Sequence, residues 1–166
     1  AFTSYRKNDA TLNDDGTVRT LLKSGYHRTP AEMERKNNIS ETAFGGNLQW
    51  NNNGFRVGLT ALYSQFNRPL KPDVAQEYRA DNPQGYGFLN IGASYGYINS
   101  RWNINGETAI SGNGSFATLN TVSFQPSRQV SFTAIQRYYG AKYWALHANA
   151  FSDGGQMRNE TGFLLG

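Results

Sequence analysis

Histidine, serine and side-chain amides are the residue types in this chain that could support hydrolytic chemistry. His147 and Asn149 share the polar face of a strand predicted at 143–151. Ser131 and Thr133 share the polar face of the strand predicted before it. A hydrolase needs a nucleophile, a base and an orienting group within mutual reach. Because nothing in the sequence sets the register that would bring these side chains together, we expect no enzyme, and we interpret His147 as a hydrogen-bonded residue of a polar strand face.

The sequence indicates no metal or cofactor site. The two histidines, His27 and His147, are 120 positions apart, and no carboxylates cluster near either one. Asp14-Asp15-Gly16 resembles the start of a calcium loop but lacks the later ligands, and a turn between two strands explains it. The chain has no cysteine, which excludes thiolate sites and disulfides. We therefore expect no cofactor.

Two stretches alternate apolar and polar residues with hardly a break, from Phe55 to Tyr63 and from Leu89 to Tyr97. A period of two residues is the signature of a β-strand. In both stretches one face carries aliphatic and aromatic residues, while the other is rich in glycine and small polar residues. A sheet with a water-filled lumen on one side and lipid on the other has this pattern. The sequence therefore predicts an all-β fold, an antiparallel transmembrane β-barrel.

The composition agrees with that prediction. Only 38% of the residues are hydrophobic, yet 14% are aromatic, and a barrel spreads its aromatics over an outer wall and interfacial girdles. No apolar run approaches the roughly 18 residues of a membrane helix, so insertion is expected only through strands. The formal charge of +4 is scattered along the chain, whereas nucleic-acid binders concentrate such charge in a patch.

Residues 1–166 are predicted to form one barrel segment of about ten strands. The strands are expected at 2–9, 17–25, 42–51, 54–66, 86–98, 102–111, 116–125, 129–138, 143–151 and 160–166. Short turns rich in asparagine, glycine or proline alternate with longer links, the pattern of barrels with short periplasmic turns and long outer loops. Because the short turns and the longer links alternate along the chain, the connections expected on the outer side are 26–41, 67–85, 112–115 and 139–142.

The first long loop carries a helix signal. Thr29-Pro30-Ala31-Glu32 combines a capping threonine, a proline at the first helical position and a glutamate three residues after the cap. We expect a short helix near 30–36. It either stiffens the loop or binds a partner, and we favour the stiffening role.

The predicted alternation assigns residues to two faces and to the outer loops. Side chains expected to face lipid are Val57, Leu59, Leu89, Ile91, Ile104, Phe132, Trp144 and Leu146. Lumen candidates are Arg56, Asn103, Asn105, Glu107, Arg137, His147 and Asn149. Candidates for partner contacts in the outer loops are His27, Arg28, Arg68, Lys71, Tyr78 and Arg79. The lumen charges act either as pore selectivity groups or as a salt-bridged network, and we favour the network.

Several segments carry a resemblance to a known group. Gly25-Tyr26-His27-Arg28-Thr29-Pro30-Ala31-Glu32, Arg35-Lys36-Asn37 and Phe44-Gly45-Gly46-Asn47-Leu48 occur in the first part of the chain. Gln136-Arg137-Tyr138-Tyr139, Ala148-Asn149-Ala150-Phe151-Ser152 and Asn159-Glu160-Thr161-Gly162-Phe163 follow in order. Together they resemble the barrel portion of a group of Bacteroidota outer-membrane proteins. Members often carry a helix–hairpin–helix segment of the competence type before the barrel, and this segment would bind the DNA backbone. Since these 166 residues do not include it, a role in DNA handling is only an analogy.

Two classes of function compete. The first is a bacterial outer-membrane barrel that passes solutes or belongs to a transport or secretion assembly, with the bilayer and other outer-membrane or periplasmic subunits as expected partners. The second is a soluble all-β binding module for a carbohydrate or protein ligand. Trp50, Trp102 and Trp144 lie beside predicted turns and loops, as expected of membrane girdles. In a sugar-binding module they would converge on one cleft. The start has no signal-peptide pattern and the end lacks a terminal aromatic strand, so we expect an incomplete part of a larger barrel.

Overall fold

A computed structural model describes the chain except for residues 23, 75–80, 148–151 and 153–157. The fold is all-β, with 65% strand and 3% helix, which confirms the predicted fold class at that level. The described elements are β1 Phe2–Leu12, β2 Val18–Leu22, α1 Pro30–Met33, β3 Ile39–Asn52, β4 Phe55–Leu70, β5 Gly85–Ile98, β6 Trp102–Ser111, β7 Phe116–Ser127, β8 Val130–Tyr139 and β9 Glu160–Leu165. No helix in the described part of the chain is long and apolar enough to cross a membrane.

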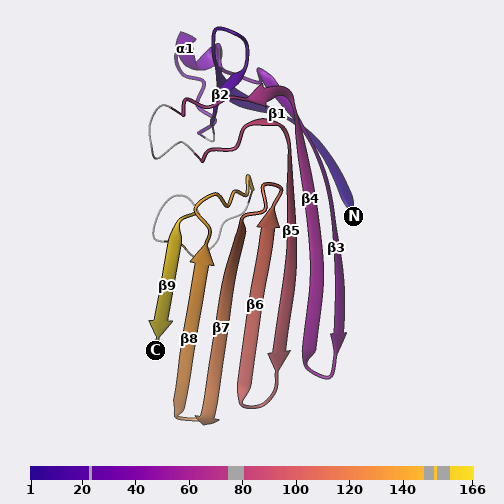
Figure 1. The fold of residues 1–166 in the computed structure, drawn as a ribbon, viewed down its shortest axis with the longest axis vertical. Coiled ribbons are helices and arrows are strands. Elements are labelled where there is room, and N and C mark those ends of the chain that lie inside the picture. The colour runs from indigo at the N-terminus through magenta and orange to yellow at the C-terminus, as the bar shows by residue number, and fades with distance from the viewer. Residues whose placement is uncertain (23, 75–80, 148–151, 153–157) are drawn as a thin grey trace. The chain divides into compact units, whose positions relative to one another are not determined.

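The described strands form one sheet in the order β2-β1-β3-β4-β5-β6-β7-β8-β9 (Figure 1). An additional parallel pairing joins Val18 of β2 to Leu70 of β4, so β1 to β4 close into a small four-stranded barrel. From β5 to β9 each strand pairs antiparallel with the next one in the sequence. Sequential antiparallel pairing is the topology that a chain of hairpins produces.

The chain divides into two compact units. The barrel unit comprises Ala1–Gly45 and Leu62–Leu89, and the sheet unit comprises Gly46–Ala61 and Asn90–Gly166. The first contains the closed barrel of β1 to β4. The second contains β6 to β9 and the parts of β3, β4 and β5 that adjoin their tight turns.

The core of the barrel unit is built from alternate strand positions. Val18, Ile39 and Phe66 are each at most 2% exposed, whereas Phe44, on the other face of β3, is half exposed. Glu41 is also buried, and its carboxylate accepts hydrogen bonds of 2.9 Å from Arg6 Nε and from Asn8 Nδ2. The buried charge is tolerated because the guanidinium and the amide replace the water it has lost.

The loop between β2 and β3 contains the helix that the capping box predicts. The Thr29 hydroxyl caps the amide of Glu32 at 3.3 Å, and Pro30 occupies the first turn. The helix ends at Met33 rather than near residue 36, and turns follow until Asn37, which has a left-handed φ of 51°. The Asp9 carboxylate accepts a 2.8 Å hydrogen bond from the Asn37 amide. This contact ties the end of the loop back to β1.

Tight turns join the strands of the sheet unit where the sequence predicts them. Asn53 and Gly54 have φ angles of 44° and 83°, the left-handed geometry of a two-residue hairpin. Asn99 Oδ1 accepts 2.8 Å hydrogen bonds from the amides of Arg101 and Trp102, which closes the β5–β6 turn. In β7 the register with β8 shifts between Phe124 and Ser127, where Pro126 has no amide to donate.

Several predicted strand boundaries, and one predicted strand, differ from the structure. β3 begins at Ile39 and β4 continues to Leu70, so the second long link begins at residue 71 rather than 67. The strand predicted at 143–151 is wrong for its described part, because residues 143–147 are irregular. Within the described residues the sheet therefore has nine strands rather than ten. Trp144 and Leu146 consequently do not occupy the lipid-facing strand positions assigned to them.

An ion pair joins the last two strands of the sheet unit. Arg137 Nε of β8 lies 2.6 Å from Glu160 Oε1 of β9, with 10% and 16% of the two side chains exposed. Arg137 is opposite Gly162 in the β8–β9 register. A Cβ at position 162 would lie 2.5 Å from the Arg137 Nε atom. The glycine therefore leaves room for the guanidinium to cross toward Glu160.

Glu160→Gln should lower the free energy of unfolding by about 3 kcal/mol, because it leaves a mostly buried guanidinium without its counter-charge. Equilibrium unfolding in urea, followed by tryptophan fluorescence, measures this loss. The matched control is Glu107→Gln, since this exposed carboxylate makes no hydrogen bond or ion pair with a described residue, and its effect should stay within about 0.5 kcal/mol. Equal effects of the two substitutions would contradict a stabilising pair.

Candidate functional site

The sheet unit has one polar and one apolar face, set by strand alternation and by the register of the strand pairs. The polar face carries Arg56, Gly58, Asn90, Gly92, Ser94, Gly96, Asn103, Asn105, Glu107 and Arg137. The apolar face carries large side chains that are 40–69% exposed over much of its extent, among them Val57, Leu59, Ile91, Ile110, Phe116, Phe132 and Phe163. Most of the predicted lumen candidates therefore share a face.

Three lumen candidates form a hydrogen-bonded row on the polar face. Arg56 Nη2 donates to Asn105 Oδ1 at 2.7 Å, and Asn105 Nδ2 donates to Asn103 Oδ1 at 2.6 Å. Gly96 is opposite Asn105, and a Cβ there would lie 3.0 Å from Asn105 Oδ1 and 3.5 Å from Arg56 Nη2. The glycine face thus gives these long polar side chains room to lie flat across the strands.

The two other charged candidates differ in their surroundings. Glu107 is opposite Ser94 on one side and Leu119 on the other, and its side chain is exposed. Arg137 of β8 is paired with the same Leu119 of β7 on its other side, but its side chain is buried in the ion pair with Glu160. Arg137 thus forms a salt bridge, while Arg56 and Glu107 keep their charged groups exposed on the polar face.

One of the remaining two lumen candidates is described, and it does not lie on a strand. His147 is exposed in a bend after β8, so its predicted position on a polar strand face is wrong. Asn149 lies outside the described residues. Thr133 is one of the residues considered above for hydrolytic chemistry. Its hydroxyl group shares a 3.1 Å hydrogen bond with the hydroxyl group of Ser123 on β7. In the described part of the chain no group of three or more His, Asp or Glu residues could hold a metal ion.

The segment after β8 covers part of the polar face, which the sequence did not indicate. Tyr143 is only 6% exposed and packs in a cluster with Ala117 and Tyr139, with Ala109 and Ala145 at its margin. Burial raises the pKa of the Tyr143 phenol, and the charge of Glu107 raises it further. A sequence signal was present in Gly140, where a Cβ would lie 2.9 Å from the carbonyl oxygen of Phe116. Glycine at the end of a strand often marks such a close backbone approach.

The described outer-loop candidates all make contacts within the barrel unit. His27 Nε2 lies 2.7 Å from Asp9 Oδ2, and Arg28 pairs with Glu32 at 3.2 Å while its guanidinium lies 4.1 Å from the ring centre of Tyr26. Contacts with Arg28, first its amide and then its side chain, lower the pKa of Glu32. Tyr78 and Arg79 lie outside the described residues.

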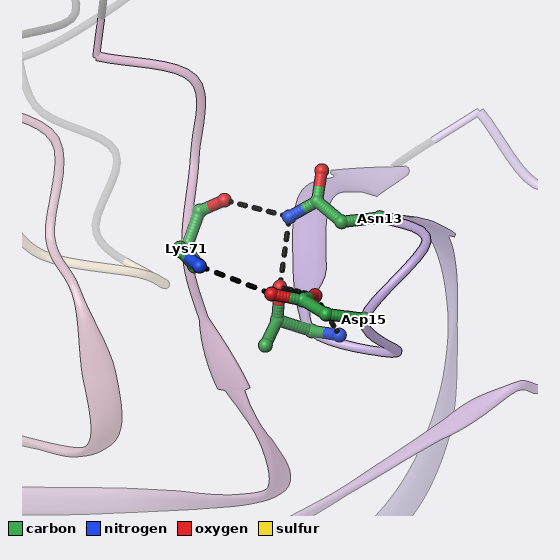
Figure 2. A network of polar contacts seen from close by, with 4 residues as sticks. Asn13, Asp15 and Lys71 are labelled. Atoms are coloured by element: carbon green, nitrogen blue, oxygen red, sulfur yellow. Dashed lines mark hydrogen bonds and ion pairs between the residues drawn. The ribbon is translucent and has the colours of Figure 1, made fainter.

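Arg68 and Lys71 hold the β1–β2 turn against the end of β4, and Figure 2 shows the contacts of Lys71 with Asn13 and Asp15. Lys71 Nζ lies 3.0 Å from Asp15 Oδ2, and its carbonyl oxygen accepts a 3.0 Å hydrogen bond from Asn13 Nδ2. Arg68 Nη1 donates to the Gly16 carbonyl at 3.0 Å. The Lys71 amide donates to the Val18 carbonyl at 2.8 Å. These four contacts surround the Val18–Leu70 pairing that closes the small barrel.

Comparison of the chain with protein-family models, with curated proteins and with solved structures finds no match.

The Asp15 contacts make the closure of the small barrel dependent on pH. Hydrogen bonds from the Thr17 hydroxyl and amide, followed by the contact with Lys71, lower the Asp15 pKa from 3.8 to about 2. A carboxyl whose pKa is depressed in the folded state stabilises the fold above its unfolded pKa of about 4 and loses that contribution as the pH falls toward 2. Wild type should therefore have a higher Tm than Asp15→Asn at pH 6, and the difference should shrink as the pH falls from about 4 through 2.

Thermal unfolding of both proteins between pH 6 and pH 2 measures this difference. Asp14→Asn is the matched control, because Asp14 is exposed in the same turn and makes no hydrogen bond or ion pair with a described residue. Its Tm should follow that of the wild type across the whole range. A gap between wild type and Asp15→Asn that stays constant down to pH 2 would contradict the role of the ionised carboxylate.

Proposed function

We propose that the sheet unit is part of the wall of a bacterial outer-membrane β-barrel, with its apolar face toward lipid and its polar face toward water. In this proposal the protein acts in transport across that membrane, or as the membrane component of a larger transport or secretion assembly. The observation that carries the proposal is the distribution of aromatic side chains on the apolar face.

Aromatic side chains cluster near both ends of the strands on this face. Near the tight turns, Trp102 and Phe124 stack with ring centres 4.3 Å apart, and Phe55 packs on Tyr97 at 4.5 Å. Near the opposite ends, the rings of Phe116 and Tyr138 lie 5.0 Å apart.

The spacing of the two clusters suits a bilayer. Phe116 and Phe124 are eight positions apart on β7, which is about 26 Å along a strand. At a strand tilt of about 40° this becomes roughly 20 Å across the membrane, close to the apolar band of about 25 Å between the aromatic girdles of outer-membrane barrels.

Polar groups on the apolar face are paired with one another. Tyr95 Oη donates to Asn120 Oδ1 at 2.6 Å, and Asn120 Nδ2 donates to Gln136 Oε1 at 2.7 Å. Thr108 and Thr118 share a further hydrogen bond of 3.0 Å. An unpaired polar group costs several kcal/mol in hydrocarbon, so this mutual pairing supports a lipid-facing position.

The alternative of a soluble binding module conflicts with the same face. Leu59, Ile91 and Phe132 are 57%, 49% and 58% exposed, and they belong to a broad set of exposed apolar side chains. Soluble monomers rarely expose contiguous apolar patches larger than a few hundred Å². The polar face is also too rich in glycine and charge to be the dry interior of a sandwich.

The edge of the sheet supports the proposal that this wall belongs to a larger barrel. Among the described strands, β9 has a neighbour only on the β8 side. In a bilayer the free backbone groups of such an edge need a further strand, because no water is present to bond them. Phe163 and Leu165, which alternate on β9, are highly exposed on the apolar side.

Ile91→Arg and Ser94→Arg test the assignment of the faces. Ile91 is opposite Ile110 on the apolar face, whereas Ser94 is opposite Glu107 on the polar face. Arginine at position 91 should cost roughly 2–4 kcal/mol near the bilayer midplane, while arginine at position 94 gains a carboxylate partner. Equilibrium unfolding in lipid vesicles measures both changes.

Two outcomes would overturn the proposal. Equal tolerance of arginine at the two positions would show that neither face meets lipid. A wild-type chain that is monomeric and folded without detergent would favour the soluble binding module. We expect instead that the protein stays folded only in detergent or lipid and that Ile91→Arg alone impairs folding.

A further inference from the structure

We infer that residues 140–147 form a constriction that lies across the aqueous side of the wall and sets the size of the solutes that pass. This inference rests on the proposed transport function. It concerns a segment that was divided, in the prediction from the sequence, between an outer connection at 139–142 and a strand at 143–151.

The packing of Tyr143 places this segment on the polar face. Tyr143 is buried against Ala117 and Tyr139, which are opposite each other in the β7–β8 register. Tyr139 follows Arg137 by two positions, so the two side chains lie on the same face of β8. Ala117 is likewise opposite Ala109, two positions after Glu107 on β6. The Tyr143 ring therefore covers the face that carries Glu107 and Arg137.

Hydrogen bonds hold the segment across several strands. It leaves β8 at Gly140, whose amide donates to the Phe116 carbonyl at 3.0 Å. Asn113 Nδ2 donates to the Lys142 carbonyl at 2.6 Å. Asn90 Nδ2 of β5 donates to the Trp144 carbonyl at 2.8 Å. The backbone thus reaches from β8 to β5, and three strand spacings amount to about 14 Å.

The side chains beneath residues 140–147 fit that segment in size and in hydrogen bonding. Ala109 and Ala117 are small, so the strands leave space for the Tyr143 ring. The carbonyl groups of Lys142 and Trp144 meet side-chain amides from two different parts of the sheet unit. A segment merely exposed in an outer loop would need neither a buried aromatic anchor nor these amides. An inward-folded segment narrows a lumen, and pore diameter is a main determinant of selectivity.

Tyr143→Ala should release the segment and widen the passage. We expect a larger single-channel conductance in planar lipid bilayers and faster entry of larger neutral oligosaccharides in vesicle-swelling assays. Tyr138→Ala is the matched control, because it removes a tyrosine ring from β8 on the face opposite the segment, where Tyr138 packs on Phe116. Its conductance should equal that of the wild type.

A thiol-labelling experiment tests whether residues 140–147 pack on the polar face, and it does not depend on transport. The chain has no cysteine, so Ala117→Cys and Lys142→Cys each introduce a single thiol and keep the Tyr143 ring in place. The thiol at position 117, which is 7% exposed and packs against that ring, should react slowly with a membrane-impermeant maleimide, and the thiol at the exposed position 142 should react fast. Both should react fast in urea.

The outcomes separate this inference from the proposed function. Equal labelling of the two thiols in the folded protein would overturn the inference. So would unchanged conductance and size limit in Tyr143→Ala when the wild type conducts. Conductance in Tyr143→Ala with none in the wild type would support a closed constriction. Protected labelling with no conductance in either protein would overturn the proposed transport function, and the constriction with it.

Discussion

The two-residue period of the β-strands is the constraint on which the rest of this molecule depends. Successive side chains point to opposite faces, and a register slip of one residue would exchange the faces throughout a strand. The observed register of β5 to β8 places Ser94, Glu107 and Arg137 on one face. This alignment also determines where the aromatic clusters form, which side chains Arg56 contacts, and which residues Tyr143 packs against.

Closure of the small barrel is the second requirement of the fold. The strands β1 and β2 are joined by a short turn, and β2 meets β4 through the single described residue pair Val18–Leu70. One residue pair stabilises the closure of the barrel only weakly. The contacts of Arg68 and Lys71 with the β1–β2 turn add the hydrogen bonds that a longer strand pairing would have supplied. The basic residues of the predicted outer loop thus serve the fold of the barrel unit.

Local patterns predicted much of this structure from the sequence. The tight turn at Asn53-Gly54 and the cap at Thr29 lie where turn and capping chemistry placed them, because both depend on a few neighbouring residues. The course of residues 143–147 was not predictable in the same way. Their apolar and polar residues alternate as in a strand, but Tyr143 gains more by packing between Ala117 and Tyr139, a contact between distant parts of the sequence. The pairing of Arg137 with Glu160 likewise depends on register, which alternation alone does not specify.

The most direct test of the central claim compares two neighbouring positions of β4. Leu59 is 57% exposed on the apolar face, and Thr60 follows it on the polar face, where its hydroxyl accepts a 2.8 Å hydrogen bond from Asn47. A nitroxide label attached through a single cysteine at each position, in protein reconstituted into lipid vesicles, reports collisions with oxygen and with a polar nickel chelate. The account predicts that the label at 59 meets mainly oxygen, which concentrates in lipid, and that the label at 60 meets mainly the nickel chelate. Equal access of the nickel chelate to both labels would contradict a lipid-facing wall.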